Sequence, residues 1–481
     1  MHKETVAYLL GRLLLALSAV LLLPILLAFA EPLPIFSFLA ASLLTMLAGL
    51  FFLYQGRRRE SLTIREGIAF TGLAWLLAGF FGMLPFVFGG YLLPLDAFFE
   101  SLSGFTGLGA TVFPTLTAVP RAILFWRSLT HWLGGLGIIV IFIALLPNAG
   151  QGAALMYSAE ASGATSERVL PRIRDMARWL FRIYAIFTFL AFLTLFLCGM
   201  SPFEAINHAM STVGTGGFST YDDSAAHFQS LAIELCMACF MFLSGGNYAL
   251  YYSAWQKGWH VFRRNSEFKA YALMIFGATF AITLDLWFSL GENLGTSWRH
   301  AFFQVTSLAT TGFASTNFDQ WPSLSKGILL LLMLIGGSAG STAAGLKVSR
   351  VIMLLRMAKR MVLHKLHPRQ MLEVRLNGTK IDSGTLHRVA LFFFLYMLFL
   401  TSFALFYMLA GFVPFDALGL SLTALGCVGP AFGVAGPTEN FATFSAFTKS
   451  LLCIEMLLGR LEMFTLLAML FPSFWKSRGN W

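Results

Sequence analysis

The chain has 481 residues, of which 57% are hydrophobic and only 12% are charged. Soluble globular domains carry about 25% charged residues, so this composition excludes a soluble enzyme or binding domain and indicates a protein embedded in lipid. The net charge of +10 does not indicate a nucleic-acid partner, because the basic residues gather in the segments between apolar stretches.

Charge-poor stretches long enough to cross a bilayer occur ten times. They cover about residues 10–30, 33–54, 67–93, 127–146, 180–201, 228–254, 270–291, 327–346, 389–413 and 450–474. The first is too long for a signal peptide and no small-residue cleavage site follows it, so it is expected to be a span.

The basic residues alternate between the connecting segments. If the N-terminus is cytoplasmic, the inner segments hold 27 of the 33 Lys and Arg residues, and the outer segments hold ten acids against five bases. Positive charge on cytoplasmic loops is the usual topology signal, so both termini are expected in the cytoplasm. The negative outer face would attract cations.

Four glycines recur in similar surroundings, at spacings of 108, 95 and 117 residues. They are Gly109, Gly217, Gly312 and Gly429. Apolar residues stand eleven, seven and four positions ahead of each glycine and mark one face of a short helix. Thirteen positions ahead stands a charged residue: Asp96, Glu204, Arg299 or Asp416. Six positions ahead stands a hydroxyl, expected mainly to pack or bond within the helix: Ser103, Ser211, Thr306 or Thr423.

Each unit therefore reads as a helix of about three turns that enters a glycine turn on the outer side. Non-helical backbone at membrane depth must line a water-filled path, and rings of carbonyls replace the hydration shell of a monovalent cation. The candidate ion-binding residues are Gly107, Leu108, Gly109, Ala110, Thr215, Gly216, Gly217, Phe218, Thr310, Thr311, Gly312, Phe313, Cys427, Val428, Gly429 and Pro430. The alternative interpretation is that these glycines are ordinary turns.

Two glycines stand side by side inside the second apolar stretch of units one to three, and a glycine followed by an arginine takes their place in unit four. The pairs are Gly134-Gly135, Gly245-Gly246, Gly336-Gly337 and Gly459-Arg460. Such pairs indicate either close helix packing or a break beneath a pore. Residues 336–347 are too rich in Gly, Ser and Thr for a helix facing lipid, so a break is predicted there.

Arg460 lies within an apolar stretch, where a charge costs several kcal/mol and is by default functional. It takes the place of the second glycine in its unit, so it is expected to face the same axis and meet the loop 336–347. The alternative is a structural salt bridge with Glu462 or Glu455. Asp285 and Glu234 are expected to face protein neighbours.

Enzyme chemistry finds no support in the sequence. The run from Gly340 to Lys347 is similar to a phosphate-binding loop, but Leu346 precedes the lysine and no strand precedes the glycines. His131 and His208 have no metal-ligand spacing, and the five cysteines fall in apolar segments.

The fourfold repeat, the TGGF and TTGF loops, IGGSAGSTAAGLK and MLLGRLEMF resemble the Trk/Ktr/HKT superfamily of potassium-translocating subunits over nearly the whole chain. Two extra N-terminal helices are similar to its TrkH-like branch. The resemblance implies potassium uptake across the bacterial inner membrane, with the glycine loops as the potassium filter. It also implies an intramembrane gate made of Gly336, Gly337, Ser338, Gly340, Ser341, Thr342, Gly345, Lys347 and Arg460.

The same resemblance implies a homodimer on a cytoplasmic TrkA-like ring of regulatory subunits. Nucleotide is expected only on those partners, and potassium is the transported ion rather than a resident cofactor. Gly107-Leu108 departs from the family, which usually has hydroxyl residues there. A less selective Na⁺/K⁺ pathway, and coupling to H⁺ or Na⁺ instead of channel-like permeation, remain open.

The expected fold is an all-α polytopic membrane protein with two leading helices and four pseudosymmetric repeats of helix, pore helix with loop, and helix around a central path. The predicted divisions are 1–60 for the leading helices, 61–150, 151–260, 261–365 with the gate loop, and 366–481.

Overall fold

The structure, a computed structural model, describes residues 1–28, 32–57, 63–137, 140, 173–370, 372–461 and 463–476. These residues are mostly helical, which confirms the predicted all-α fold class. The strands in the described part form one short antiparallel hairpin of β1 Arg375–Leu376 and β2 Thr379–Lys380.

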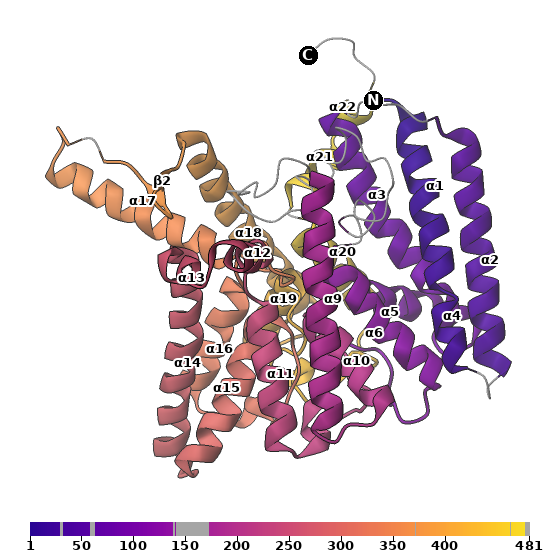
Figure 1. Cartoon of the computed structure of the whole chain (residues 1–481), viewed down its shortest axis with the longest axis horizontal. Coiled ribbons are helices and arrows are strands. Elements are labelled where there is room, and N and C mark those ends of the chain that lie inside the picture. The colour runs from indigo at the N-terminus through magenta and orange to yellow at the C-terminus, as the bar shows by residue number, and fades with distance from the viewer. Residues whose placement is uncertain are drawn as a thin grey trace.

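The two leading helices pack against each other at one edge of the molecule (Figure 1). They are α1 Lys3–Val20, continued by η1 Leu23–Leu27, and α2 Pro32–Gln55. A Cβ built on Gly11 would lie 2.7 Å from the carbonyl oxygen of Gly49, so the helix backbones touch directly. Small residues allow such close contact between helices in lipid. The outer face of α2 exposes large apolar side chains such as Phe36 and Phe51, as a helix facing lipid does.

The rest of the chain repeats three kinds of helix. The first helices are α3 Ile64–Gly82, α9 Ile173–Leu197, α14 Ser266–Leu290 and α18 Ser383–Leu409. The short helices that enter the glycine loops, called pore helices below, are α5 Pro94–Thr106, α10 Pro202–Val213, α15 Leu294–Thr310 and α19 Pro414–Gly426. The second helices are α6 Arg121–Gly135, α11 Leu231–Ser244, α16 Ser323–Ile335 and α20 Ala446–Arg460.

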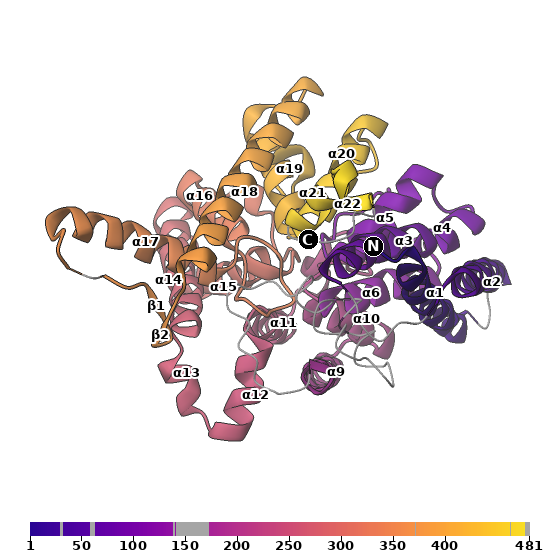
Figure 2. The ribbon, with the colours of Figure 1, turned by 90° about the horizontal axis from the view of Figure 1, so that it is seen from above.

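Packing between the units is cyclic. Each pore helix packs on the first helix of its own unit, and each second helix packs on the pore helix of the next unit. Thus α6 contacts α10, α11 contacts α15, α16 contacts α19, and α20 returns to α5. The four units therefore surround a common centre, as the view from above also shows (Figure 2).

Three of the four pore helices begin at the same kind of start signal. Proline occupies the first turn of α5, α10 and α19, where its missing N–H costs nothing. The acids thirteen positions ahead of the glycines fall in the first turn of these three helices, where the helix dipole favours negative charge. The remaining charged residue, Arg299 of the third unit, instead makes a two-point ion pair with Glu234, with N–O distances of 2.7 Å.

The second helices do not run through their apolar stretches without interruption. Within the described residues, six helical segments are long and apolar enough to cross a bilayer, and α11 with α12 Tyr248–Lys257 forms a pair bent by 87°. The second helices have only 13 to 15 residues and stop at the glycine pairs or, in unit four, at Gly459-Arg460. These pairs thus mark a break in every unit, and the prediction of a break at 336–347 is confirmed. Part of the stretch 127–146 lies outside the described residues.

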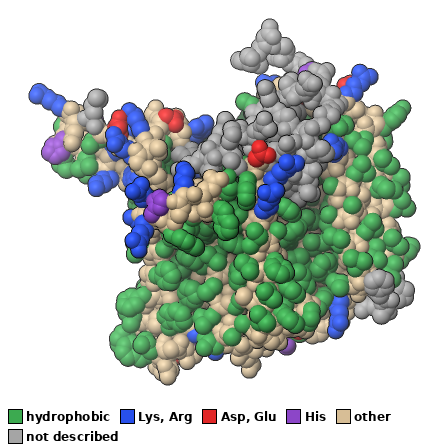
Figure 3. All heavy atoms as spheres, in the orientation of Figure 1, with side chains coloured by type: hydrophobic (Ala, Val, Ile, Leu, Met, Phe, Trp, Pro, Cys, Tyr) green, Lys and Arg blue, Asp and Glu red, His purple; other side chains and the backbone are tan. Residues whose placement is uncertain are grey.

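Several shorter elements complete the described chain. They are α4 Leu84–Phe88, η2 Ser224–Phe228, α13 His260–Arg264, η3 Phe318–Gln320, α17 Val348–Leu366, η4 Gly433–Ala435, α21 Phe464–Leu470 and α22 Pro472–Trp475. The N-terminus, α17 and α22 lie at one end of the molecule (Figure 1), which is called the N-terminal side below. On the face shown in Figure 3, apolar side chains cover the body and most Lys and Arg side chains gather toward this side.

The breaks depend on close backbone contacts. A Cβ on Gly134 would lie 1.8 Å from the carbonyl oxygen of Phe105, at the end of α5. We expect Gly134→Ala to lower stability by about 1–3 kcal/mol, the usual cost of overpacking. Thermal unfolding in detergent measures it. Gly277→Ala is the control, because a Cβ on Gly277 would meet nothing within 4 Å; equal melting temperatures for both variants would contradict the contact.

Candidate functional site

The four glycine loops meet and form a closed ring. All four glycines have φ between +78° and +104°, a region that favours glycine. A Cβ built on each would come within 1.9 to 3.1 Å of the carbonyl oxygen just ahead of the glycine in the next loop. The pairs are Gly109 with Gly216, Gly217 with Thr311, Gly312 with Val428, and Gly429 with Leu108. The last pair returns to the first loop, so the ring has no gap.

The backbone two positions ahead of the glycine is also left-handed in three loops. Gly107 has φ +80°, Thr215 has +52° and Cys427 has +48°. For a threonine and a cysteine this conformation costs of order 1 kcal/mol or more, and such strain clusters at functional sites. Gly107 thus gives its loop a left-handed turn like those of the second and fourth loops.

Hydroxyl groups of the pore helices support the loops from behind. Ser103 Oγ donates to the carbonyl of Ala110 at 2.6 Å, and Thr423 Oγ1 donates to the carbonyl of Gly429 at 2.5 Å. In the third unit Ser307, one residue later than expected, donates to the carbonyl of Phe313. Thr306 bonds within its helix, and Ser211 Oγ is buried with no partner among the described residues. The hydroxyls therefore do more than the internal packing expected of them in two units.

His131, which has no metal-ligand spacing in the sequence, joins the first unit to the second loop. Its Nε2 accepts the backbone N–H of Phe218 at 3.2 Å. Its Nδ1 must then carry the proton in the neutral ring, and it lies 2.6 Å from the carbonyl oxygen of Gly104. The ring also packs on Phe218, with the centroids 4.1 Å apart. The sequence signal for a role at the loops is its position three residues ahead of Gly134. Its spacing to other histidines or cysteines indicates no metal site.

A buried ion pair joins the same two loops farther from the N-terminal side. Arg127 Nε lies 2.7 Å from Glu100 Oε1, and both side chains are at most 1% exposed. Glu100 also accepts the N–H of Val112, and Arg127 donates to the carbonyl of Ser219. Each member of the pair thus holds a backbone group just beyond the ring. No local pattern in the sequence indicates this pair, because its members are 27 residues apart.

On the side away from the N-terminus, the ring opens into a cavity of about 220 Å³ lined by all four loops. Two carboxylates, Asp222 and Glu439, stand among its lining residues, together with Arg127, which Glu100 neutralises. Asp222 accepts the N–H of Leu116 at 2.7 Å, so its position is fixed. The entrance is therefore net negative, and a cation is favoured there.

On the N-terminal side, residues 336–347 lie directly against the ring. Thr342 Oγ1 lies 3.3 Å from the carbonyl oxygen of Val213, at the end of pore helix α10. The loop leaves helical geometry at Gly336 with φ +75° and returns after Lys347, whose φ is +74°. Lys347 Nζ donates back to the carbonyl of Ala343. This segment is called the gate loop below.

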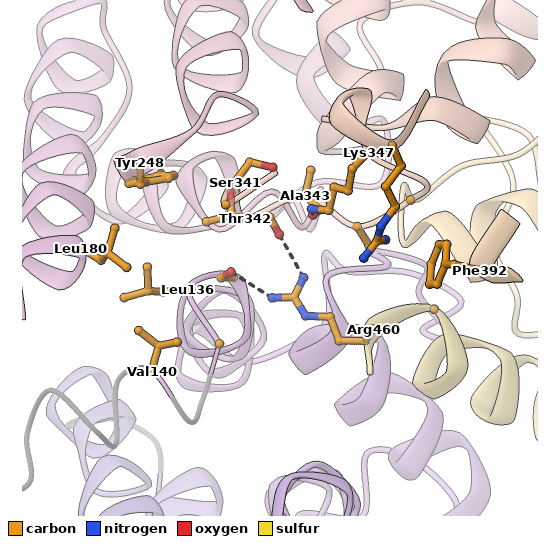
Figure 4. A pocket seen from close by; sticks show the side chains of 17 residues that line it. Leu136, Val140, Leu180, Tyr248, Ser341, Thr342, Ala343, Lys347, Phe392 and Arg460 are labelled. Carbon is orange, nitrogen blue, oxygen red and sulfur yellow. Dashed lines mark hydrogen bonds between the residues drawn. The ribbon is translucent and has the colours of Figure 1, made fainter. Parts of the chain in front are cut away.

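Arg460 meets the gate loop, as its position in the repeat predicts. Its guanidinium donates to the carbonyl oxygens of Thr342 at 3.0 Å and Gly135 at 2.9 Å, and also to that of Gly134 (Figure 4). Glu455, one of its two expected ion-pair partners, instead accepts from Tyr407 and Ser421. Glu462 lies outside the described residues. Asp285 and Glu234 face protein neighbours as expected, since Asp285 accepts from Ser325 and Glu234 pairs with Arg299.

A second cavity, of about 90 Å³, lies beside the gate loop and Arg460. Figure 4 shows Arg460 directed toward Thr342 of the gate loop, Lys347 directed toward Ala343 within the same loop, and Phe392 nearby. Arg350 also lines this cavity. A cation crossing here would meet positive charge, whereas the cavity on the other side of the ring carries carboxylates.

The fold and the site together define a multi-pass membrane protein built around four pore loops. A family profile described as "TrkH: Cation transport protein" matches residues 37–282 and 268–476. The chain belongs to this TrkH family of cation transport proteins.

Its relatives match along most of their length. It is 38% identical to the Trk system potassium uptake protein TrkH of Salmonella typhimurium, over 87% of this chain and 88% of that protein. It is 34% identical to the protein of the same name from Halomonas elongata, over 99% of this chain and all of the relative. The crystal structure of the potassium transporter TrkH from Vibrio parahaemolyticus superposes with a TM-score of 0.89, at 32% identity, over 99% and 100% of the two chains.

The ring predicts a graded effect of glycine substitution. A Cβ on Gly312 would lie 1.9 Å from the carbonyl oxygen of Val428, whereas one on Gly217 would lie 2.7 Å from that of Thr311. We expect Gly312→Ser to reduce potassium over sodium selectivity more than Gly217→Ser, with protein level retained in both. Reversal potentials under mixed ions in lipid bilayers measure the ratio.

Gly327→Ser serves as the control, because a Cβ on Gly327 in α16 would meet nothing within 4 Å. Selectivity equal to that of the unchanged protein in both folded ring variants would show that the ring is not a filter.

Proposed function

We propose that this protein carries potassium ions across the bacterial inner membrane, through the ring formed by its four glycine loops. The observation that carries the proposal is the closure of the ring. In it, the glycine of each loop lies close to a backbone carbonyl oxygen of the next loop. The potassium itself is supported by the names of the relatives, which are potassium uptake proteins matched over most of the chain.

The filter consists of the carbonyl groups of the loops at 107–110, 215–218, 310–313 and 427–430. Potassium loses its hydration shell there and gains carbonyl oxygens in its place. The pore helices direct their C-terminal, partially negative ends toward the same centre, which further favours a cation. Hydroxyl donors on Ser103 and Thr423 hold the carbonyls of Ala110 and Gly429 in place, so the filter keeps its size.

Strict selectivity is favoured over the less selective Na⁺/K⁺ alternative by the backbone of the first loop. Leu108 replaces a hydroxyl residue, but a filter of carbonyls needs the turn rather than the side chain. Gly107 has the same left-handed φ as Thr215 and Cys427. Coupling to H⁺ or Na⁺ remains the alternative mechanism.

The gate loop and Arg460 form the barrier on the cytoplasmic side of the filter. The gate residues are those predicted from the sequence: Gly336, Gly337, Ser338, Gly340, Ser341, Thr342, Gly345, Lys347 and Arg460. The contact of Arg460 with Thr342 supports a single barrier made of both parts.

The protein assembles as a homodimer on a cytoplasmic ring of TrkA-like subunits that bind the nucleotide. Both termini are cytoplasmic, so the N-terminal side of the molecule faces the regulatory subunits. The Trk system names of the relatives support partner subunits. The basic segment 350–388 is the docking region on this chain.

Growth of a potassium-uptake-deficient bacterium tests the function directly. Expression of this protein should restore growth at low potassium, and a tenfold excess of sodium should leave that growth unchanged. Sodium that abolishes rescue would favour the less selective pathway. Rescue that collapses with the proton or sodium gradient, while the membrane potential is held, would favour coupled transport.

The barrier gives Arg460 a measurable role. A guanidinium about 6 Å from a potassium ion repels it by roughly 3 kcal/mol at an effective dielectric near 20. Arg460→Ala should therefore raise ion flux by up to about a hundredfold, with the filter still selective. Deletion within 338–344 should act in the same direction.

Arg460→Lys, which keeps the charge, is the control for Arg460→Ala and should stay near the original flux in reconstituted liposomes. If both folded variants, the alanine substitution and the deletion, conduct at the original rate, Arg460 and the loop are not a barrier.

Docking of the regulatory ring predicts an effect of charge on α17. Lys359, Arg360 and Lys365 are exposed there. Changing all three to Gln should weaken co-purification with the regulatory subunits at physiological salt by at least about tenfold, since exposed charge pairs act together in association. Changing Lys257, Arg263 and Arg264 to Gln on another connection is the matched control. Full co-purification of the α17 variant would exclude this docking surface.

A further inference from the structure

The gate loop is held at several points by elements of the second and third units. Ser338 donates its N–H to the carbonyl of Gly245 at 2.8 Å, and Tyr248 donates its N–H to the carbonyl of Gly340 at 3.2 Å. Ala339 donates its N–H to Glu267 Oε1 at 2.6 Å. The last contact differs in kind, because its acceptor is a carboxylate, and hydrogen bonds to charged groups are the stronger ones.

Glu267 is well placed to hold a backbone N–H. It is 5% exposed and belongs to the first turn of α14, where the helix dipole stabilises a negative charge. The start of α14 is itself fixed by Asn265, whose side chain accepts the N–H of Phe268 at 2.9 Å. The carboxylate therefore reaches the loop from a defined helix end.

The residue next to Glu267 is bound to the cytoplasmic hairpin. The backbone N–H and the hydroxyl of Ser266 both donate to Asn377 Oδ1, each at 2.8 Å. Asn377 lies in the turn between β1 and β2 and has φ +50°. The hairpin also packs on α17 through Met353, Val374 and Leu376. It thus touches both the helix that carries Glu267 and the helix that directly follows the gate loop.

We infer that Glu267 is a positioning residue of the gate, and that the hairpin 375–380 is the element through which cytoplasmic events reach it. Glu267 holds Ala339 and keeps the loop against the filter. A displacement of the hairpin moves Ser266 and the start of α14, and so withdraws the carboxylate from the loop. This inference deepens the proposed function and rests on it for the meaning of the gate, but the contact itself can be tested without transport.

Hydrogen–deuterium exchange of the peptide that contains 338–344 reports the contact in the purified full chain. Glu267→Ala should speed exchange at Ala339 by about tenfold or more, because it removes a charge-assisted hydrogen bond and leaves the N–H without its acceptor. Glu267→Gln should stay within about threefold of the original protein, because its side-chain carbonyl still accepts this N–H.

Asp285→Ala is the matched control. Asp285 lies on the same helix and holds Ser325 by the same kind of contact, at the other end of α14. This variant should leave exchange of 338–344 unchanged. Asn377→Gly keeps a left-handed turn and removes the acceptor for Ser266, and it should speed exchange of the loop two- to threefold, by less than Glu267→Ala.

Potassium flux into liposomes then connects the contact to the gate. Glu267→Ala should conduct faster than the original protein with unchanged ion selectivity, and Glu267→Gln should restore flux near the original. Equal exchange in Glu267→Ala and the original protein would overturn the positioning role, and equal exchange in Asn377→Gly would remove the hairpin from it. Faster exchange of 338–344 in Glu267→Ala, with no potassium flux in any variant or in the original protein, would support the contact and contradict the proposed transport.

Discussion

Backbone that leaves the helix inside a bilayer must find new partners for its N–H and C=O groups, and this requirement governs the centre of the protein. The chain leaves helical geometry in the four glycine loops and again at the four broken second helices. All of these places lie together, and their backbone groups are met by neighbouring units or face two small cavities. Cyclic packing makes this possible, because the second helix of each unit lies beside the pore helix of the next.

Polar side chains around the ring serve the same requirement. Glu100, Arg127 and His131 bond almost entirely to backbone groups of the first two loops or to each other. Glu455 does comparable work in the fourth unit, where it joins Ser421 of the pore helix to Tyr407. A buried charge is costly without a partner. Here each of these groups has hydrogen-bond partners, and together they support the ring from outside.

The two sides of the ring differ in charge. Carboxylates line the cavity on one side, whereas Lys347, Arg350 and Arg460 line the cavity on the other. The ion path proposed above, with an attractive entrance and a positively charged inner barrier, needs a movable part, and the gate loop has the composition for it. Its glycines permit left-handed turns at Gly336, Gly340 and Gly345, which a helix-forming sequence would resist.

Much of this arrangement could be predicted from the sequence, because hydrophobic stretches, repeated glycines and an intramembrane arginine are local signals. The meeting of Arg460 with the gate loop followed from its place in the repeat. The early ends of the second helices in the other three units did not, because hydropathy is the same on either side of a break. The roles of His131 and of the Arg127–Glu100 pair depend on contacts across units, which no local spacing reveals. Glu455 was close to Arg460 in sequence, but helix α20 directs it to Tyr407.

The central claim is that a potassium ion sits inside the ring of backbone carbonyls. Crystals of the protein with thallium(I) in place of potassium would locate the ion by anomalous scattering. The account predicts a peak on the ring axis, surrounded by the carbonyl oxygens of Leu108, Gly216, Thr311 and Val428. A peak confined to the cavity beside Asp222 and Glu439, with none within the ring, would contradict it.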